Sequence, residues 1–485
     1  MRPTVAVIGG GISGLSAAHT LAKYASHLDV ILLEASSRLG GVLETTHRDG
    51  FLIEGAAENF LTNPPPAVDL CHDIGQSNCL SSPNSENRRS LVMYRGRLQP
   101  IPPGFVAMAP SRIWPLLKSR VLSWRGKLRV GCEYFIPRRA SDDDESVASF
   151  VCRRFGSELY QRLVQPLVGS IYGVPPERLS LESTMPRFRQ MERECGSLIR
   201  AAHRQRRKKP KENSAGARYS QFAAPRHGMS SLIEAIAQRL PDGTVELASP
   251  VNSLLRLERD RWLLLIGGDR PRWQEVDALI LATPAYAAAK LLARMDSVLA
   301  DELAQIEYSS CALISLGYCE NQIERPLDGF GFVVPLVERR NILSCSYSSV
   351  KYNGRAPKGT VLLRVFIGGA IHEGLLRLSD NELIELARSE VSDVLKIHGE
   401  PILTHVSRRP HSMPQYEVGH RERINGINQR IARFPTLALA GSAYGGVGIP
   451  SCVASGQAAA EACLSRLKLP RTASCATLAE AEASL

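Results

Sequence analysis

A glycine-rich turn near the N-terminus constrains the fold of this chain more than any other feature. The β-branched run Thr4–Ile8 leads into the spacing Gly9-x-Gly11-x-x-Gly14, and apolar residues then recur at helical intervals. This order predicts a buried parallel strand, a tight turn and a helix. A second apolar run follows and ends at Glu34, 20 residues beyond Gly14. The N-terminal region therefore reads as the first unit of an α/β fold.

Each part of this motif suits the binding of a dinucleotide. Glycines permit the tight turn and let the backbone approach a pyrophosphate, to which the helix N-terminus presents free N–H groups and a positive dipole. Glu34 is placed to accept hydrogen bonds from ribose hydroxyls, and its charge disfavours the 2′-phosphate of NADP. The sequence predicts a Rossmann-type dinucleotide site, rather than a glycine-rich turn without a ligand. Its residues are Gly9, Gly10, Gly11, Ile12, Ser13, Gly14 and Glu34.

Composition places the chain among ordinary globular proteins. Its 485 residues are 44% hydrophobic and 22% charged, which excludes a disordered chain, a small disulfide scaffold and a polytopic membrane protein. The net charge of +11 favours anionic partners, namely acidic small molecules, anionic lipid or nucleic acid. The 11 cysteines include no C-x-x-C pair, so we expect neither a zinc ribbon nor a dithiol redox motif. Isolated cysteines of this kind predict a reducing, cytoplasmic setting.

Two apolar stretches and one basic run bear on membranes and nucleic acid. Residues 5–22 contain four glycines and residues 276–293 are interrupted by Pro284, so we expect neither a signal peptide nor a transmembrane span. The basic run 204–211 lacks interleaved aromatic residues, which argues against nucleic acid. We expect residues 200–217 to form an exposed, solvated connector, with a lipid-binding patch as the alternative. No H-E-x-x-H or comparable spacing indicates a metal site.

Changes in the pattern of apolar and charged residues divide the chain into parts. Helical patterns rich in arginine occupy the stretch after residue 90, and α/β patterns return after residue 225. The expected parts are a first portion of the dinucleotide domain (1–90), a helical domain (91–211), a second dinucleotide portion (225–290), a substrate domain (291–409), a C-terminal dinucleotide portion (410–467) and a tail (468–485).

The residues after Glu34 separate FAD from NAD. The string Glu34-Ala35-x-x-Arg38-x-Gly40-Gly41 resembles the second half of the FAD fingerprint of flavoproteins of the glutathione-reductase type. In such proteins paired glycines let the chain pass close to the cofactor, and the resemblance implies that Arg38 approaches a phosphate or ribose. The alternative for Arg38 is a surface ion pair.

Four further segments resemble the porphyrinogen oxidases of haem biosynthesis, the family of protoporphyrinogen IX and coproporphyrinogen III oxidases. They are Glu54-Gly55-Ala56-Ala57-Glu58-Asn59-Phe60, Pro166-Leu167-Val168-x-x-Ile171-Tyr172-Gly173 with Leu179-Ser180-Leu181, Met413-Pro414-Gln415-Tyr416-x-Val418-Gly419-His420, and Ala440-Gly441-Ser442-x-x-Gly445-Gly446-Val447-Gly448-Ile449-Pro450-x-Cys452. The resemblance runs from about residue 4 to residue 466.

This resemblance implies a flavin-dependent oxidase with three parts. These are a discontinuous Rossmann-type FAD-binding domain, a mixed α+β substrate domain and a helical insertion that often touches membrane. The implied partners are a tetrapyrrole substrate and O2, and the implied reaction is a six-electron oxidation of a porphyrinogen that yields H2O2 and needs no dedicated catalytic base. The implied flavin contacts outside the first turn are Glu34, Ala35, Arg38, Gly40, Gly41, Gly55, Ala56, Ala57, Glu58, Val251, Gly441, Val447, Gly448 and Ile449. For Val251, a plain core valine is an equal alternative.

Two departures from the family pattern concern the substrate. The family's Arg-Trp pair appears here as Arg408-Arg409, and Val106 stands where some eukaryotic members carry a propionate-binding arginine. Another base must therefore meet the substrate carboxylates, and Arg409 is our candidate. The choice between coproporphyrinogen III and protoporphyrinogen IX stays undecided, although the net charge leans toward the more acidic coproporphyrinogen.

Other functions stay open on the sequence alone. A carotenoid (phytoene-type) desaturase shares the N-terminal fingerprint and the glycine-rich end. An amine oxidase is disfavoured because its C-terminal G-E-x-T-like segment is replaced by residues 441–444. A flavin-fold scaffold without turnover is a third alternative. Peripheral contact with the inner face of the membrane and a homodimer are also open.

Overall fold

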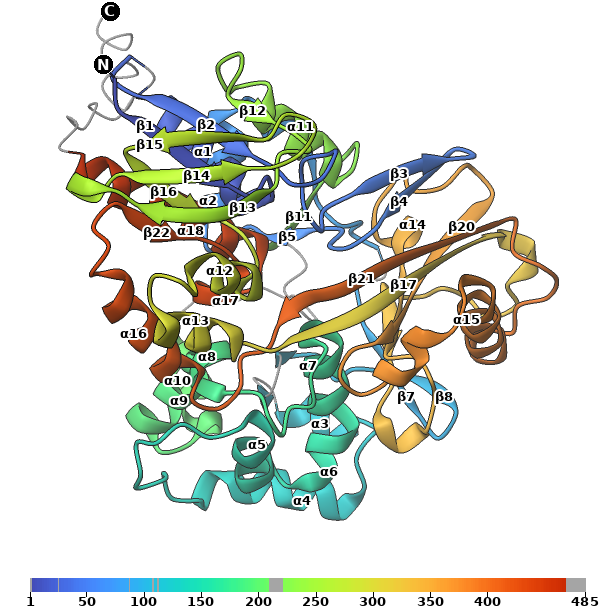
Figure 1. The fold of residues 1–485 in the computed structure, drawn as a ribbon. Helices are drawn as coiled ribbons and strands as arrows, with labels where there is room; N and C mark the ends of the chain where they lie inside the picture. Colours follow the sequence, from blue (N-terminus) through green and yellow to red (C-terminus); the bar gives the residue numbers. More distant parts are fainter. Residues whose placement is uncertain are drawn as a thin grey trace, which may run out of the picture.

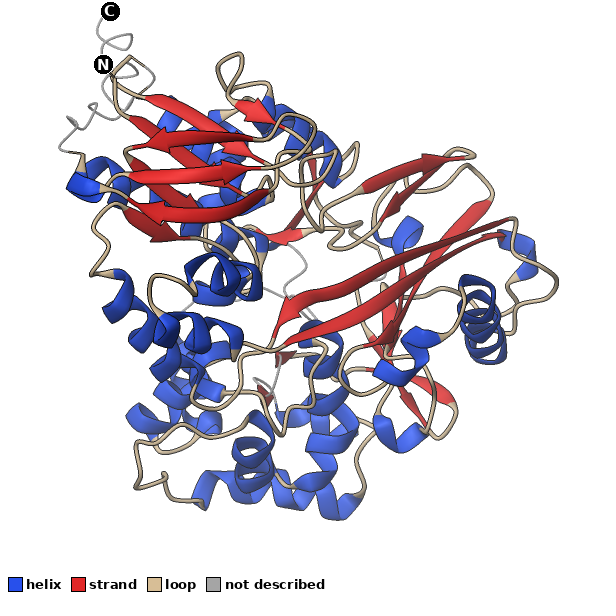
Figure 2. Ribbon diagram, viewed as in Figure 1, coloured by secondary structure: helices blue, strands red, loops and turns tan. Residues whose placement is uncertain are grey.

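Two large sheets and a group of helices build the molecule. The computed structural model describes residues 2–24, 26–86, 88–106, 109–110, 113–208 and 221–467. A five-stranded sheet lies at the upper left of Figure 1, a seven-stranded sheet at the right, and most of the helices below them. Figure 2 shows the same division, with strands above and to the right and helices at the bottom.

All neighbouring strands of the five-stranded sheet are parallel. In the register, Val7 lies opposite Leu32 on one side and Ile280 on the other. The predicted strands 4–8 and 29–33 are thereby confirmed, and they lie side by side as the strand–turn–helix–strand order requires. The strand order is β12 (Val245–Glu246), β2 (Asp29–Leu33), β1 (Thr4–Ile8), β16 (Ala278–Leu281) and β22 (Leu437–Leu439).

Alternate side chains of β1 enter two different cores. Val5 and Val7 pack on the helix side, with residues of α1 (Ile12–Ala22), α11 (Met229–Ala237) and α18 (Ile449–Arg466). Ala6 and Ile8 pack on the other face, against the antiparallel sheet that contains Trp262. A strand buried on both faces needs apolar residues at every position, which explains the run TVAVI. The covering sheet consists of β13 (Val251–Arg256), β14 (Trp262–Ile266) and β15 (Arg272–Val276).

The seven-stranded sheet combines segments from distant parts of the chain. Its strands are β21 (Leu403–Pro414), β17 (Tyr308–Cys319), β20 (Thr360–Gly368), β19 (Ser344–Tyr347), β18 (Gly331–Val333), β7 (Leu91–Tyr94) and β8 (Arg97–Pro100), in that order. Helix α15 (Asp380–Leu395) packs on it. The expected helical domain therefore begins with two strands that belong to this sheet, while the division into domains itself stays a prediction.

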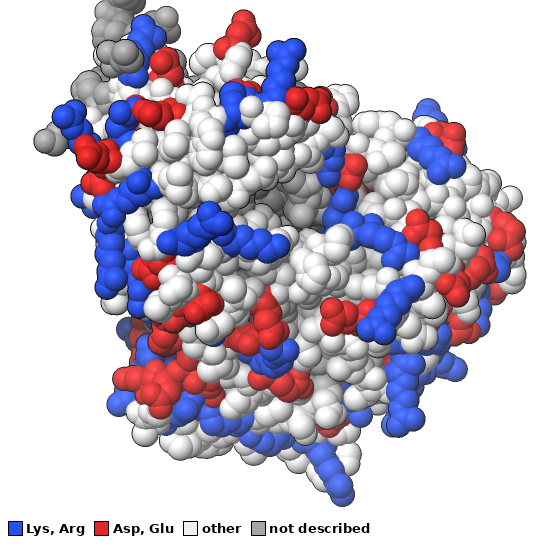
Figure 3. Space-filling model, viewed as in Figure 1, with Lys and Arg blue, Asp and Glu red and all other residues white. Residues whose placement is uncertain are grey.

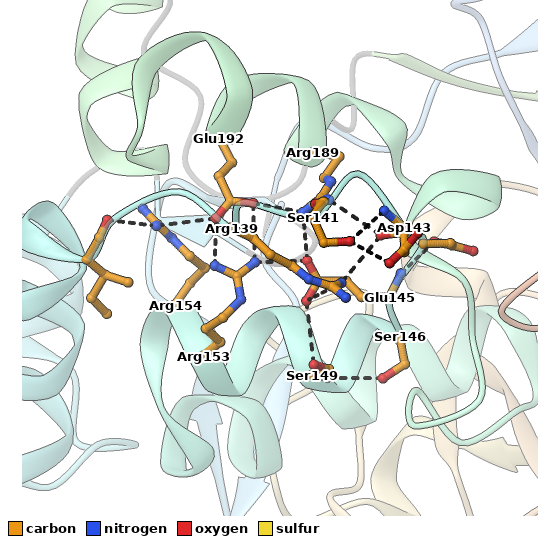
Figure 4. Close-up of polar contacts among 12 residues, drawn as sticks. Arg139, Ser141, Asp143, Glu145, Ser146, Ser149, Arg153, Arg154, Arg189 and Glu192 are labelled. Carbon is orange, nitrogen blue, oxygen red and sulfur yellow. Dashed lines mark hydrogen bonds and ion pairs between the residues drawn. The ribbon is translucent and has the colours of Figure 1, made fainter.

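The helical part contains a buried network of arginines and glutamates. Arg154 and Glu133 are both fully buried and form an ion pair. Glu192 accepts hydrogen bonds from Arg153 and Arg189, and Figure 4 shows its carboxylate between the guanidinium groups. The main helices of the helical part are α3 (Ile113–Lys118), α4 (Trp124–Gly131), α5 (Val147–Phe155), α7 (Gln165–Tyr172), α9 (Pro186–Cys195) and α10 (Leu198–Lys208).

Helix α10 corrects the expectation of a solvated connector over residues 200–217. The chain is helical up to Lys208. Leu198, Ile199, Ala201 and Ala202 are buried, so this helix has an apolar face that the charge run concealed. Residues 209–217 and the expected tail 468–485 lie outside the described residues.

Three further observations concern the described part of the chain. Every cysteine in it is free. No helix within it is long and apolar enough to cross a membrane. It holds no group of three or more potential metal ligands.

Candidate flavin site

Gly9, Gly11 and Gly14 of the N-terminal turn differ in the space around their Cα atoms. Gly9 has a φ of +109°, and a Cβ there would lie 2.7 Å from the carbonyl oxygen of Ala282. A Cβ at Gly14 would overlap the carbonyl oxygen of Gly9. A Cβ at Gly11, in contrast, would meet nothing within 4 Å. Gly9 and Gly14 therefore serve the close packing of strand and helix, whereas Gly11 borders open space.

The open space lies at the positive end of α1. Gly11 is the N-cap of this helix, no side chain caps it, and its first turn contains no acidic residue. The first N–H groups of a helix have no partner within the helix. The opposite wall is formed by glycine as well, because a Cβ at Gly41 would lie 3.4 Å from the Cα of Gly11. Backbone N–H groups without a helical partner, bordered by glycines on both sides, fit the pyrophosphate of FAD.

Glu34 lies at the carboxyl end of β2 and touches the turn. Its Oε2 accepts a hydrogen bond of 2.6 Å from the N–H of Gly10, and its Oε1 accepts one of 2.8 Å from the N–H of Ser36. The side chain is half-buried. This carboxylate is fixed beside the turn, and its contact with the ribose of a bound dinucleotide stays a prediction.

Arg38 forms an ion pair with Glu44, which was the alternative to a contact with phosphate or ribose. Its guanidinium donates to the carbonyl oxygens of Gly41 at 2.7 Å and Leu43 at 3.1 Å, and lies 3.5 Å from the carboxylate of Glu44. Arg38 thus holds the loop with the paired glycines Gly40 and Gly41. Its contact with a phosphate or ribose stays a prediction.

The C-terminal glycine-rich segment reaches the same edge of the sheet because α18 packs on α1. A Cβ at Gly456 would overlap the carbonyl oxygen of Ser13, and Ser16 donates a hydrogen bond of 3.1 Å to the carbonyl of Val453. Helix α18 begins at Ile449, directly after the N-cap Gly448. The packing brings the start of α18, with the predicted contacts Gly441, Val447, Gly448 and Ile449 before and at it, toward the N-terminal turn.

Val251 is connected to this edge through the residues before it. The N–H of Ala248 donates to the carbonyl of Ser36, and the N–H of Ser249 donates to that of Glu34, both at 2.9 Å. Val251 itself begins β13 and is partly buried against the core on that face. The structure therefore places Val251 two residues from a Glu34 contact, and its direct contact with flavin stays a prediction.

The predicted flavin turn 55–58 is held by arginines of the seven-stranded sheet. Arg364 on β20 donates to the carbonyl of Ala56 and lies 3.1 Å from the carboxylate of Glu58. Lys351 lies 2.9 Å from the same carboxylate. Burial acts to raise the pKa of Glu58, but the charges of Lys351 and Arg364 outweigh it and hold this pKa far below its usual range. The Glu58 carboxylate thus has partners within the chain, and the contact of residues 55–58 with flavin stays a prediction.

Arg409 on β21 holds the beginning of the same turn. Its Nε donates a hydrogen bond of 2.9 Å to the carbonyl of Gly55, and its Nη2 lies 2.6 Å from Oε2 of Glu44. The side chain is 14% exposed. The arginine expected to meet a substrate carboxylate therefore has a partner within the chain, and its role with substrate stays a prediction.

Two residues at this edge were missed by the sequence reasoning. The hydroxyls of Thr283 and Tyr444 are buried and have no hydrogen-bond partner among the described residues. Thr283 follows β16, and Tyr444 lines a cavity of about 400 Å³ together with Pro64 and Pro450. Orphaned polar groups at the carboxyl end of parallel strands are typical of a ligand site, and the position of Thr283, two residues beyond a buried strand, was the available signal.

Comparison with known proteins agrees with this geometry. The model of the flavin-containing amine oxidoreductase family matches residues 12–464. The chain is 33% identical to the coproporphyrinogen III oxidase of Bacillus subtilis over 474 residues, which are 96% of this chain and 98% of that relative. It is 27% identical to the mitochondrial protoporphyrinogen oxidase of Nicotiana tabacum, over 96% of this chain and 95% of that relative.

A solved structure is also similar over the full fold. It comes from Exiguobacterium sp. 255-15 and has a provisional assignment as a protoporphyrinogen oxidase. The TM-score is 0.84 at 29% identity, covering 96% of this chain and 99% of that chain. The fold and site thus define an FAD-dependent oxidoreductase of the flavin-containing amine oxidoreductase class. Within that class, the chain belongs to the FAD-dependent porphyrinogen oxidases, which confirms the predicted family, fold class and cofactor.

Proposed function

We propose that the protein oxidises coproporphyrinogen III to coproporphyrin III. The observation that carries this proposal is the similarity to the Bacillus subtilis coproporphyrinogen III oxidase, which spans nearly all of both chains at 33% identity. The protoporphyrinogen oxidase of Nicotiana tabacum is less similar, at 27%. The net charge of +11 supports the same choice, because this substrate carries four carboxylates. Figure 3 shows Lys and Arg side chains spread over one face of the molecule, interspersed with Asp and Glu.

The residues of the chain serve mainly to position the reactants. When bound, FAD would supply the redox chemistry, a two-electron oxidation of the substrate with O2 as the final electron acceptor and H2O2 as its product. The free N–H groups at the start of α1 bind the pyrophosphate, and Glu34 orients the ribose. Arg364 and Arg409 fix the turn 55–58. Pyrrole protons leave to solvent, so no side chain acts as a dedicated base.

We propose Arg409 as a binding residue for one substrate carboxylate. Its guanidinium is only partly exposed, and its charge is shared with Glu44 at 2.6 Å. An incoming carboxylate would compete with Glu44 for the same donors. This arrangement binds an acidic substrate reversibly, since the arginine never lacks a counter-ion.

We also propose that the protein works in the cytoplasm, with its helical part in contact with the inner face of the membrane. Trp114, Trp124, Leu128 and Phe135 are between 62% and 80% exposed. Lys118 lies over the ring of Trp114, and Arg125 lies over the ring of Trp124. Exposed aromatic rings next to basic side chains are typical of a surface that enters an anionic lipid interface.

The substrate proposal is tested by assaying both porphyrinogens side by side with the FAD-loaded protein. We expect kcat/KM for coproporphyrinogen III to exceed that for protoporphyrinogen IX at least tenfold, about 1.4 kcal/mol of transition-state binding. A preference for protoporphyrinogen IX would overturn the choice of substrate but not the class of reaction.

The membrane proposal has its own test. Cosedimentation with anionic vesicles should retain the wild-type protein and lose a Trp124→Ala/Phe135→Ala variant, while neutral vesicles retain neither. Equal binding of both proteins to anionic vesicles would refute a role for these side chains. The Trp273→Ala variant serves as the matched control. Trp273 is also exposed, but it lies on β15 of the antiparallel sheet that covers the five-stranded sheet.

A further inference from the structure

The backbone of the short segment between β22 and α18 is flexible by itself and depends on contacts with other residues for its conformation. Helix α17 (Ser442–Gly445) lies between Gly441 and Gly446, whose φ angles are +138° and +136°. Such values are open to glycine alone, so the segment has little conformational restriction of its own. The residues that follow it, Gly448 and Ile449, begin α18 at the flavin site.

The hydroxyl of Tyr416 joins the two ends of this segment. It donates a hydrogen bond to the carbonyl oxygen of Ser442 and accepts one of 2.7 Å from the N–H of Gly446. The Tyr416 side chain is buried. One oxygen atom therefore fixes the distance between residue 442 and residue 446.

His420 holds the middle of the segment and supports the tyrosine. Its ring stacks on the ring of Tyr416 with centroids 4.2 Å apart and planes 16° apart. Its Nε2 lies 3.0 Å from the carbonyl oxygen of Ala443, which requires the proton on Nε2. Burial lowers the pKa of His420 to about 4, so the ring is neutral near pH 7 and keeps this single donor.

The chain around Tyr416 is itself attached to two other parts of the molecule. Its backbone carbonyl accepts a hydrogen bond of 2.7 Å from the N–H of Ser180, which precedes a helix of the helical part. The neighbouring Gln415 donates a hydrogen bond of 2.9 Å to the hydroxyl of Ser309 on β17. Tyr416 therefore transmits the position of both parts to the 442–446 segment.

We propose that Tyr416 and His420 are positioning residues for the flavin ring system. They hold the 442–446 segment so that the start of α18, where Ile449 and Ser451 carry an N–H and Pro450 does not, faces the flavin. The positive end of a helix stabilises an electron-rich, reduced ring more than an oxidised one. This inference deepens the proposed function, but it rests on the FAD site alone and not on the identity of the substrate.

The first test removes only the hydroxyl. Tyr416→Phe keeps the stacked ring and loses both hydrogen bonds to the segment. We expect the apoprotein to bind FAD about tenfold more weakly. We expect the preference for reduced over oxidised flavin to fall by a similar factor, which lowers the two-electron potential of the bound flavin by about 30 mV. Both quantities are measured without substrate, by fluorescence titration and by equilibration with a redox dye.

A matched control removes a hydroxyl of another kind. The hydroxyl of Tyr347 is buried in the seven-stranded sheet and has no hydrogen-bond partner among the described residues. Tyr347→Phe should leave FAD affinity and potential unchanged. An equal effect of both variants would show that Tyr416 acts through general stability and would overturn the proposal.

Two variants of His420 separate the hydrogen bond from the stacking. His420→Phe keeps a ring beside Tyr416 but loses the donor to Ala443, and we expect it to resemble Tyr416→Phe. His420→Gln keeps an N–H donor and should retain a potential near that of the wild type. Folded Tyr416→Phe and His420→Phe proteins with wild-type affinity and potential would overturn the proposal. If Tyr416→Phe does not fold, the two His420 variants decide the question, and a failure of porphyrinogen turnover affects neither readout.

Discussion

Arg409 and Glu44 form an ion pair in which Nη2 lies 2.6 Å from Oε2, while Nε of the same arginine donates to the carbonyl of Gly55. The hydrogen bond from Arg409 is the largest influence on Glu44 and lowers the pKa of its carboxyl. Glu44 directly precedes the hairpin of β3 (Thr45–Arg48) and β4 (Phe51–Glu54), and Gly55 directly follows it. Arg409 therefore joins the seven-stranded sheet to both ends of this hairpin. The arginine that we propose for substrate binding is therefore supplied with an internal counter-ion.

This pair predicts opposite effects of two single substitutions on substrate affinity. Arg409→Gln should raise KM for coproporphyrinogen III about tenfold, because a charged hydrogen bond of roughly 1.5 kcal/mol is lost. Glu44→Gln should lower KM, because it frees the guanidinium for the substrate. Steady-state kinetics of the two variants and the wild type measure both changes. Unchanged KM values in both variants would remove Arg409 from the substrate site.

The geometry of the N-terminal turn predicts different effects for substitutions of two of its glycines. Gly11→Val adds a side chain where a Cβ meets no protein atom within 4 Å, so the apoprotein should melt like the wild-type apoprotein and purify without FAD colour. Gly14→Ala adds a Cβ that overlaps the carbonyl oxygen of Gly9, so the fold itself should lose stability, by about 1–3 kcal/mol. Thermal melting and the flavin absorbance of the purified proteins measure these effects. A Gly11→Val protein with stoichiometric FAD would show that the pyrophosphate lies elsewhere.

The N-terminal half of the site could be predicted from the sequence because its chemistry is local. The strand at 4–8, the glycine spacing and Glu34 lie within 31 residues, and the structure places them together as predicted. The contacts that join distant segments could not be predicted. Nothing in the sequence pairs Glu44 with Arg409 or Tyr416 with Gly446, because the register of the long strand β21 sets those distances.

Helix α10 shows a second limit of sequence reasoning. Its basic residues dominate the composition, but the helix is held by the apolar positions Leu198, Ile199, Ala201 and Ala202. A charge run reports the solvent face of a helix as readily as a loop.

The buried carboxylate of Glu58 predicts a pH-dependent contribution to stability. Burial raises its pKa, but Lys351 and Arg364 outweigh burial and keep the pKa in the folded protein well below the usual value of 4.5. A lowered pKa stabilises the fold above about pH 4.5, and this contribution decreases as the pH falls below it. Glu58→Gln should cost about 3–5 kcal/mol at pH 7, and less at pH 4. Denaturant unfolding at both pH values measures the difference, and a cost that does not change with pH would contradict this account.

The buried pair of Arg154 and Glu133 predicts a large stability loss in the helical part. Both side chains are fully buried, so Arg154→Met leaves an uncompensated carboxylate and should cost about 3–5 kcal/mol. The exposed pair of Lys23 and Asp73 is the matched control, and Asp73→Asn should cost less than about 1 kcal/mol. Equal losses in the two variants, measured by urea unfolding, would show that burial of the network is unimportant.

The proposed oxidation of a porphyrinogen by O2 at the flavin is tested most directly by the ratio of oxygen consumed to porphyrin formed. A porphyrinogen exceeds its porphyrin by six hydrogens, so a flavin that accepts two electrons at a time must turn over three times for each product. Oxygen consumption and porphyrin fluorescence, recorded together with the FAD-loaded protein and coproporphyrinogen III, should give three O2 consumed for each porphyrin formed. Flavin that stays oxidised when it is mixed anaerobically with the porphyrinogen, with no oxygen consumption in air, would contradict the account.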